Sequence, residues 1–201
     1  MWHDYGAMSR NVQGCQQGRK ARKPLEAVQL RDLALSYVAR YATSGARLER
    51  YLARKLAERG WADEGNPPDL GALIADFVQQ GYVDDAGYAR MRAGSLERRG
   101  YGARRVVQAL AEAGVAEPVR RAALGDAASQ REAALVLARK RRLGPFGAPV
   151  ADRAGREKQL GVLLRAGHAM DMAREIVNAA SVAALEEWAA ELDGDELHER
   201  G

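Results

Sequence analysis

The chain has 201 residues, and its 31 Lys and Arg against 27 Asp and Glu leave a net charge of +4, which is too small an excess to identify a nucleic-acid-binding protein. Its longest apolar runs are a few residues, far below the roughly 20 that span a bilayer, and its first 24 residues hold no apolar block of signal-peptide length. Cys15 is the only cysteine, which excludes a disulfide or a thiolate metal cluster within one chain. We therefore expect a cytoplasmic protein with no membrane partner.

The composition predicts an all-α protein. Alanine, leucine, arginine and glutamate dominate, whereas phenylalanine occurs twice, so helices should pack through small and medium side chains. The N-terminal residues 1–24 are polar and basic at 18–23, and we expect them to form a disordered tail.

Three segments of the chain share one arrangement, in which glycine opens an amphipathic stretch and a second glycine closes it. These segments are residues 45–60, 102–114 and 155–167, and their closing glycines lie 54 and 53 residues apart. Apolar residues three and four apart line one face of a helix, and glycine after the last turn readily adopts the left-handed conformation that ends it. Each segment is thus predicted to be the middle helix of a repeated unit.

Helical stretches are also predicted on both sides of each middle helix. The preceding ones are residues 30–42, 85–99 and 126–143, and the following ones are residues 69–80, 117–124 and 170–180. The fold expected from this pattern is three tandem three-helix units that form an elongated, curved helical array. The predicted units are residues 25–82, 83–125 and 126–180, followed by a C-terminal capping helix and tail at 181–201.

The clearest break in the helical pattern is residues 143–149, which contain two prolines and two glycines. Such a segment cannot continue a helix. We expect a hinge or an extended loop there.

Three motifs along the chain resemble those of the RecX family. They are Ala34-Leu35-Ser36-Tyr37-Val38-Ala39-Arg40, then Gly81-Tyr82-Val83-Asp84-Asp85 with Tyr88-Ala89-Arg90, then Arg99-Gly100-Tyr101-Gly102-Ala103-Arg104-Arg105. The similarity extends from about residue 30 to about residue 180. Tyr88 replaces the phenylalanine usual in the family, which should change little, and residues 165–168 depart from the family pattern, so that the exposed surface of the third unit should differ.

The resemblance implies a non-enzymatic regulator of homologous recombination. Members of the family bind the RecA recombinase, lie in the groove of its nucleoprotein filament and inhibit filament growth, ATP hydrolysis and strand exchange. We therefore expect a monomer that binds the RecA filament, with direct contact to single- or double-stranded DNA left open.

Arginines concentrated in the second and third units are the predicted partner-binding residues. An arginine fork pairs with carboxylate or phosphate groups, and a tyrosine ring between arginines can stack. The alternatives are a solvated helix face in the second unit and, in the third, favourable interaction of cations with a helix C-terminus. The predicted residues are Arg90, Arg98, Arg99, Tyr101, Arg104, Arg105, Arg139, Arg141 and Arg142.

Other polar residues are assigned structural roles. Asp84 and Asp85 should cap a helix start rather than act in catalysis, and Tyr82 and Val83 before them should pack in the core or between units. His3, His168 and His198 lack the spacing of a zinc site, so no metal is expected. The chain has no phosphate-binding lysine loop and no dinucleotide fingerprint, so no cofactor is expected.

Two other functions fit a small helical protein. A sequence-specific DNA-binding protein of helix-turn-helix type would bind naked duplex with base preference. A small helical enzyme would need a convergent polar site, which the sequence does not show.

Overall fold

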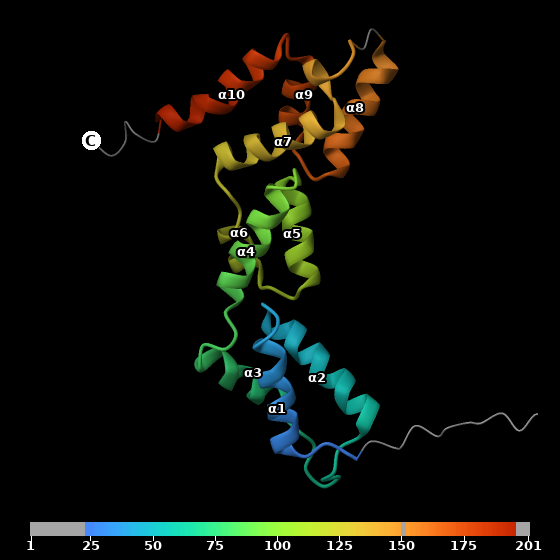
Figure 1. Cartoon of the computed structure of the whole chain (residues 1–201), viewed down its shortest axis with the longest axis vertical. Coiled ribbons are helices and arrows are strands. Elements are labelled where there is room, and N and C mark those ends of the chain that lie inside the picture. The colour runs from blue at the N-terminus through green and yellow to red at the C-terminus, as the bar shows by residue number, and fades with distance from the viewer. Residues whose placement is uncertain (1–22, 150–151, 196–201) are drawn as a thin grey trace, which may run out of the picture.

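The computed structural model describes residues 23–149 and 152–195, and these residues confirm the all-α array of three tandem three-helix units. The units stack along the long axis of an elongated molecule (Figure 1). The first unit comprises α1 (Ala27–Val38), α2 (Gly45–Arg59) and α3 (Leu70–Gln79); the second comprises α4 (Asp85–Glu97), α5 (Ala103–Glu112) and α6 (Glu117–Ala122); the third comprises α7 (Ala127–Arg141), α8 (Arg153–Arg165) and α9 (Met170–Asn178). A short 3-10 helix, η1 (Gly144–Phe146), follows α7, and α10 (Val182–Asp195) ends the described chain.

Short polar side chains start several of these helices. Ser44, Asp69, Asp84, Asp126 and Asp152 each precede a helix, and each accepts a hydrogen bond from a backbone N–H of the first turn. Such caps satisfy donors that have no partner within the helix. The predicted helix starts are therefore set by local chemistry that the sequence displays.

The hydrophobic core is divided into three clusters along the array. Leu48, Leu52 and Phe77 lie in the first cluster, and a second is built around residues of α4 and α5. The third includes Leu163 and Ile176. Because each cluster is fully buried by helices close in sequence, each group of helices has a core of its own.

The last helix, α10, packs on α7. Leu185 is buried in the third cluster, and the Arg131 guanidinium lies 4.5 Å from the ring centroid of Trp188. The apolar residues whose periodicity predicted a helix after residue 181 thus lie on the face of α10 that packs on α7.

One expectation about packing was wrong: Val83 is buried, but Tyr82 is 51% exposed because its ring only leans on Phe77 at the surface.

The break predicted at residues 143–149 is present, because α7 ends at Arg141 and α8 begins only at Arg153. The Gly144 N–H donates to the Gln159 side chain at 2.8 Å, so the start of this segment is attached to α8.

The predicted disordered tail lies outside the described residues except for Lys23 and Pro24. The Lys23 carbonyl accepts two hydrogen bonds from the Arg59 guanidinium, and Leu25 is fully buried in the first cluster. Leu25 thus belongs to the core of the first unit.

Candidate partner-binding surface

The second and third units meet where the start of α5 lies against the end of α8. The N–H of Gly102 donates to the Ala166 carbonyl at 3.0 Å, and that of Arg104 donates to the Gly167 carbonyl at 3.2 Å. A Cβ on Gly102 would lie 2.5 Å from the Gly167 backbone. Because only glycine allows so close an approach, Gly102 belongs to the contact between units.

A buried histidine completes this junction. His168 is 2% exposed, and its Nε2 lies 3.0 Å from the carbonyl oxygen of Gly100. A carbonyl only accepts, so Nε2 carries the proton. Burial lowers the pKa of His168, although the bond to Gly100 opposes the shift. The prediction of an altered exposed surface at residues 165–168 was wrong for Ala166, Gly167 and His168, because all three are buried.

The two predicted arginine clusters come together at the same junction. The Lys140 ammonium, at the end of α7, donates to the Arg99 carbonyl at 3.3 Å. The Arg99 guanidinium lies 5.3 Å from the centroid of the Tyr101 ring. Tyr101 packs against both the second and third hydrophobic clusters. Arg104 and Arg105 are exposed at the start of α5, and the Arg105 side chain donates to Gln108.

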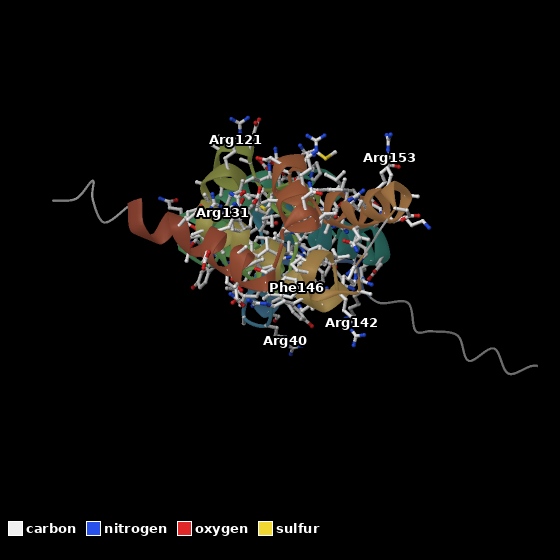
Figure 2. The ribbon with its side chains drawn as sticks, turned by 90° about the horizontal axis from the view of Figure 1, so that it is seen from above. Arg40, Arg121, Arg131, Arg142, Phe146 and Arg153 are labelled. Atoms are coloured by element: carbon white, nitrogen blue, oxygen red, sulfur yellow. The ribbon has the colours of Figure 1, made fainter. Side chains whose placement is uncertain are left out.

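Among the three predicted arginines at the end of α7, Arg139 has side-chain partners and Arg141 and Arg142 have none in the described residues. Arg139 pairs with Glu186 of α10 at 3.0 Å, and its guanidinium lies over the Phe146 ring. In the described part of the chain, no side-chain hydrogen bond or ion pair involves Arg141 or Arg142. Arg142 has a φ of 54° and points away from the body of the molecule (Figure 2). Arg139 thus has contacts within the third unit and with α10, whereas the helix-end interaction was the alternative expected for it.

The remaining two predicted residues lie on α4 and at its end. Arg98 follows the last turn of α4, close to Arg99, and is exposed. Arg90 lies eight residues earlier, about 12 Å along the helix axis, where it borders a shallow pocket beside Pro118 and Val119. The Arg98 guanidinium turns back toward Gly94, one turn earlier in α4, so Arg98 reaches the junction through its backbone position alone and Arg90 lies apart from it.

The first and second units meet in a similar way. The Ser44 hydroxyl donates to the Ala113 carbonyl at 2.5 Å, and the Gly45 N–H donates to an Asp85 carboxylate oxygen at 2.9 Å. The start of α2 thus lies against the end of α5, as the start of α5 lies against the end of α8. Asp84 caps its own helix as predicted, whereas Asp85 bonds to the start of α2.

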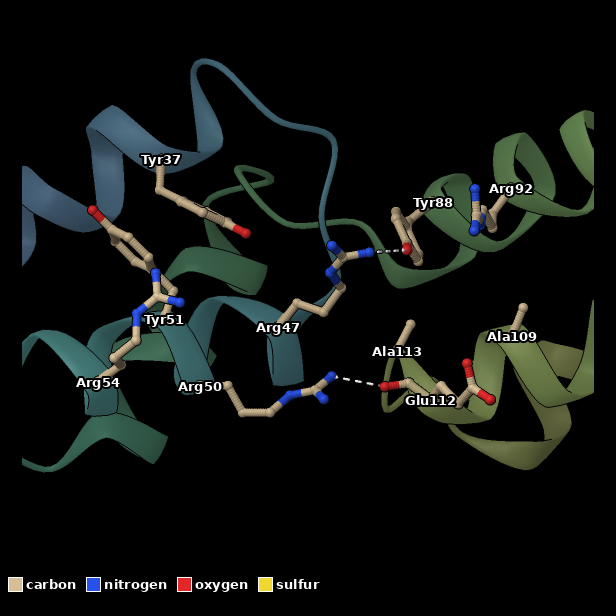
Figure 3. A pocket seen from close by; sticks show the side chains of 10 residues that line it. All are labelled: Tyr37, Arg47, Arg50, Tyr51, Arg54, Tyr88, Arg92, Ala109, Glu112 and Ala113. Carbon is tan, nitrogen blue, oxygen red and sulfur yellow. Dashed lines mark hydrogen bonds between the residues drawn. The ribbon is translucent and has the colours of Figure 1, made fainter.

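A cleft at this first junction was missed by the sequence analysis. It has a volume of about 390 Å³. Two arginines of α2 cross it (Figure 3): Arg47 donates to the Tyr88 hydroxyl at 2.8 Å, and Arg50 donates to the Glu112 carbonyl at 2.9 Å. The bond to Tyr88 raises the pKa of Arg47. Tyr88 therefore uses the hydroxyl that a phenylalanine would lack.

A signal for this cleft was present in the sequence. Arg47, Arg50 and Arg54 follow one another at spacings of three and four, which places them on one face of a helix. The predicted site residues were restricted to the second and third units, where arginines are adjacent in sequence.

Within residues 23–149 and 152–195, no group of three or more His, Cys, Asp or Glu side chains is placed to hold a metal ion. No helix in the same residues has the length and apolar character needed to cross a membrane.

Comparison with known proteins gives consistent matches. A family model described as RecX, second three-helix domain, matches residues 84–124. Regulatory protein RecX of Myxococcus xanthus (strain DK1622) is 32% identical over 81% of this chain and 91% of its own length. Regulatory protein RecX of Halorhodospira halophila (strain DSM 244 / SL1) is 35% identical over 75% of this chain and 88% of its own.

A solved structure shares the fold. The crystal structure of RecX from Lactobacillus salivarius superimposes with a TM-score of 0.58, covering 75% of this chain and 93% of that one, at 18% sequence identity.

Proposed function

The chain belongs to the RecX family of regulatory proteins, and from this premise we propose that it binds the RecA filament and inhibits filament growth, ATP hydrolysis and strand exchange. It would thereby regulate homologous recombination and DNA repair. The observation that carries the proposal is the convergence of two arginine clusters at the junction of the second and third units. An elongated array with one such surface suits a partner that is itself extended.

The proposed contact residues are those that the junction holds in place. Backbone hydrogen bonds and close glycine contacts fix α5 relative to α7 and α8. Arginine forks on a rigid support lose less conformational freedom on binding than the same side chains on a loop. The contact surface at this junction comprises Arg98, Arg99, Tyr101, Arg104, Arg105, Arg141 and Arg142, with Arg90 and Arg139 at its margins.

The mechanism is steric and competitive, and it requires one copy of the chain and no cofactor. Bound to the filament, the array occupies surface that a further RecA subunit or the incoming DNA strand needs. The arginine forks also match phosphate oxygens, so the proposal includes direct contact with single- or double-stranded DNA.

The test is single-stranded-DNA-dependent ATP hydrolysis by RecA, titrated with this protein at fixed salt. We expect inhibition well below a one-to-one ratio with RecA. A triple variant, R99A/R104A/R105A, removes three charges and no backbone contact, and should raise the half-inhibitory concentration at least tenfold, which corresponds to about 1.4 kcal/mol.

The matched control is R121A/R153A. Both arginines are exposed, each pairs with a glutamate one turn away, and they project from the side opposite Arg142 (Figure 2). The control should inhibit like the unmodified protein. If the triple variant also does so, the proposed surface is wrong; tight binding to naked duplex without any effect on RecA would favour a helix-turn-helix DNA-binding protein.

A further inference from the structure

The cleft at the first junction continues into a longer groove along α1 and α2. A second hollow of about 550 Å³ shares Tyr37, Arg47, Tyr51 and Arg54 with the cleft described above. The two hollows are therefore adjacent, and together we call them the Arg/Tyr groove. It begins on the first unit beside Arg40 and reaches the second unit at α4 and α5.

Tyrosine rings form one wall of the Arg/Tyr groove. Tyr37 stacks on Tyr51, with ring centroids 4.3 Å apart and planes 24° apart. Tyr41 leans on Tyr37 at 5.2 Å and is 57% exposed. A large ring left this open, on a support of two packed rings, offers a flat apolar face to a ligand.

The charge of the Arg/Tyr groove is strongly positive. Its charged lining consists of Arg40, Arg47, Arg50, Arg54, Lys55, Arg92 and Glu112. Glu112 accepts a hydrogen bond from Gln108. Within the described residues, no side-chain hydrogen bond or ion pair involves Arg40 or Arg92. These two cations, at opposite ends of the groove, are free to bind an anionic ligand.

We propose that the Arg/Tyr groove binds a short segment of single-stranded nucleic acid, with phosphates on its arginines and an unpaired base on Tyr41. Sequence-tolerant binding of single strands combines a positive groove with aromatic rings on which bases stack. A duplex presents its phosphates, but its bases are stacked inside and cannot pack on Tyr41. An acidic peptide would pair with the arginines but has no base to stack on the exposed ring. The inference rests on the DNA contact proposed above, and adds the form of DNA and the place where it binds.

A strand bound there would touch both units. Arg40 and Tyr41 belong to the first unit and Arg92 to the second, so one ligand spans the junction that Arg47 and Arg50 already bridge. Binding should therefore hold the two units in one relative orientation.

The test uses the full chain without RecA and a fluorescently labelled thymidine oligonucleotide, with binding followed by fluorescence anisotropy. Tyr41→Ala should weaken binding about tenfold, within the range for the loss of one base stack. The matched control is Tyr82→Ala, because Tyr82 is similarly exposed, at 51%, and does not line the groove.

The arginines are tested through salt dependence. R40A/R92A should weaken binding and reduce the slope of log affinity against log salt by about 1.4, since each phosphate contact to a single strand contributes roughly 0.7. R121A/R153A should leave the slope unchanged.

Three outcomes would overturn the inference: unchanged binding by Tyr41→Ala, equal affinity for a duplex of the same length, or competition by polyglutamate but not by unlabelled oligonucleotide. The RecA proposal fails separately, through the ATP hydrolysis assay with R99A/R104A/R105A. A strand that binds the groove without any inhibition of RecA would leave this inference standing.

Discussion

The two junctions between units share a geometry and differ in chemistry. In both, the start of one middle helix lies against the glycine-ended helix of the next unit. The first junction is joined by side chains, through the Ser44 hydroxyl and the Asp85 carboxylate, with arginines reaching across an open cleft. The second is joined by backbone, through the close contact of Gly102 with Gly167 and a buried His168.

The difference shows what a repeat must keep and what it can vary. Both junctions keep a glycine after the middle helix, Gly114 or Gly167, with a φ of 77° or 98°. The contacts around that glycine can be made by side chains and be partly open, or be made by backbone and be closed. An open junction leaves room for a ligand, whereas a closed one provides a rigid support for exposed arginines.

The largest effect is expected from Gly167→Ala. Its new Cβ would lie 2.5 Å from the Arg105 backbone nitrogen, and no side-chain rearrangement relieves a backbone clash. Together with the strain of a positive φ, this should lower the free energy of unfolding by about 3 kcal/mol. Urea denaturation measures it.

The control for this substitution is Gly81→Ala, because Gly81 has a φ of 75°, ends its helix with the same pair of backbone hydrogen bonds as Gly167, and has no heavy atom within 4 Å of the added Cβ. Only strain applies there, so the loss should be about 1 kcal/mol. Equal losses at Gly81 and Gly167 would show that the second junction is not closely packed.

A smaller effect is expected at the first junction from Gly114→Ala. The added Cβ would lie 2.3 Å from the Ala46 Cβ, which is a side-chain atom and can be deleted. We expect a loss of about 2 kcal/mol. A46G alone should cost about 1 kcal/mol because it places a glycine within α2, but it also removes the clash, so the two losses should not add in the double variant A46G/G114A. If they do add, the clash is not with Ala46 and the contrast between the junctions is lost.

The smallest effect is a pH dependence carried by His168. Its folded-state pKa is lowered by burial, so between that pKa and the unfolded value of about 6.5 the unfolded chain binds more protons. The contribution of neutral His168 is fully present above about pH 6.5 and is lost as the pH falls toward the folded pKa. One group changes stability by at most about 1.4 kcal/mol per pH unit.

The measurement is the difference in unfolding free energy between the unmodified protein and His168→Gln, from pH 8 to pH 5. As the pH falls, the unfolding free energy of the unmodified protein should decrease relative to that of His168→Gln. His3 and His198 are present in both proteins, so their contributions cancel in this difference. Asp76 and Asp126 have lowered pKa values, so their protonation affects stability only below about pH 4. A constant difference across this range would mean that His168 is not held neutral by the junction.

The sequence showed the charged residues of the proposed surface but not how they come together. The adjacent arginines 98–99 and 104–105 and those at 139–142 stood out as local charge, but nothing local showed that the Lys140 ammonium meets the Arg99 carbonyl. Their convergence depends on how α7 crosses the end of α4. The Arg/Tyr groove was missed because Tyr37, Arg47 and Arg92 come from three helices separated by loops.

The amino-acid sequence by itself determined the helices, their caps and the threefold repeat, because hydrophobic period, capping residues and closing glycines act within a few residues of one another. Tertiary structure alone decided that Asp85 bonds to Gly45, that His168 is buried against Gly100 and that Tyr82 is exposed. Asp85 and His168 bond to groups 40 and 68 residues away. Such pairings depend on how whole helices dock, and no pattern confined to one helix specifies that docking.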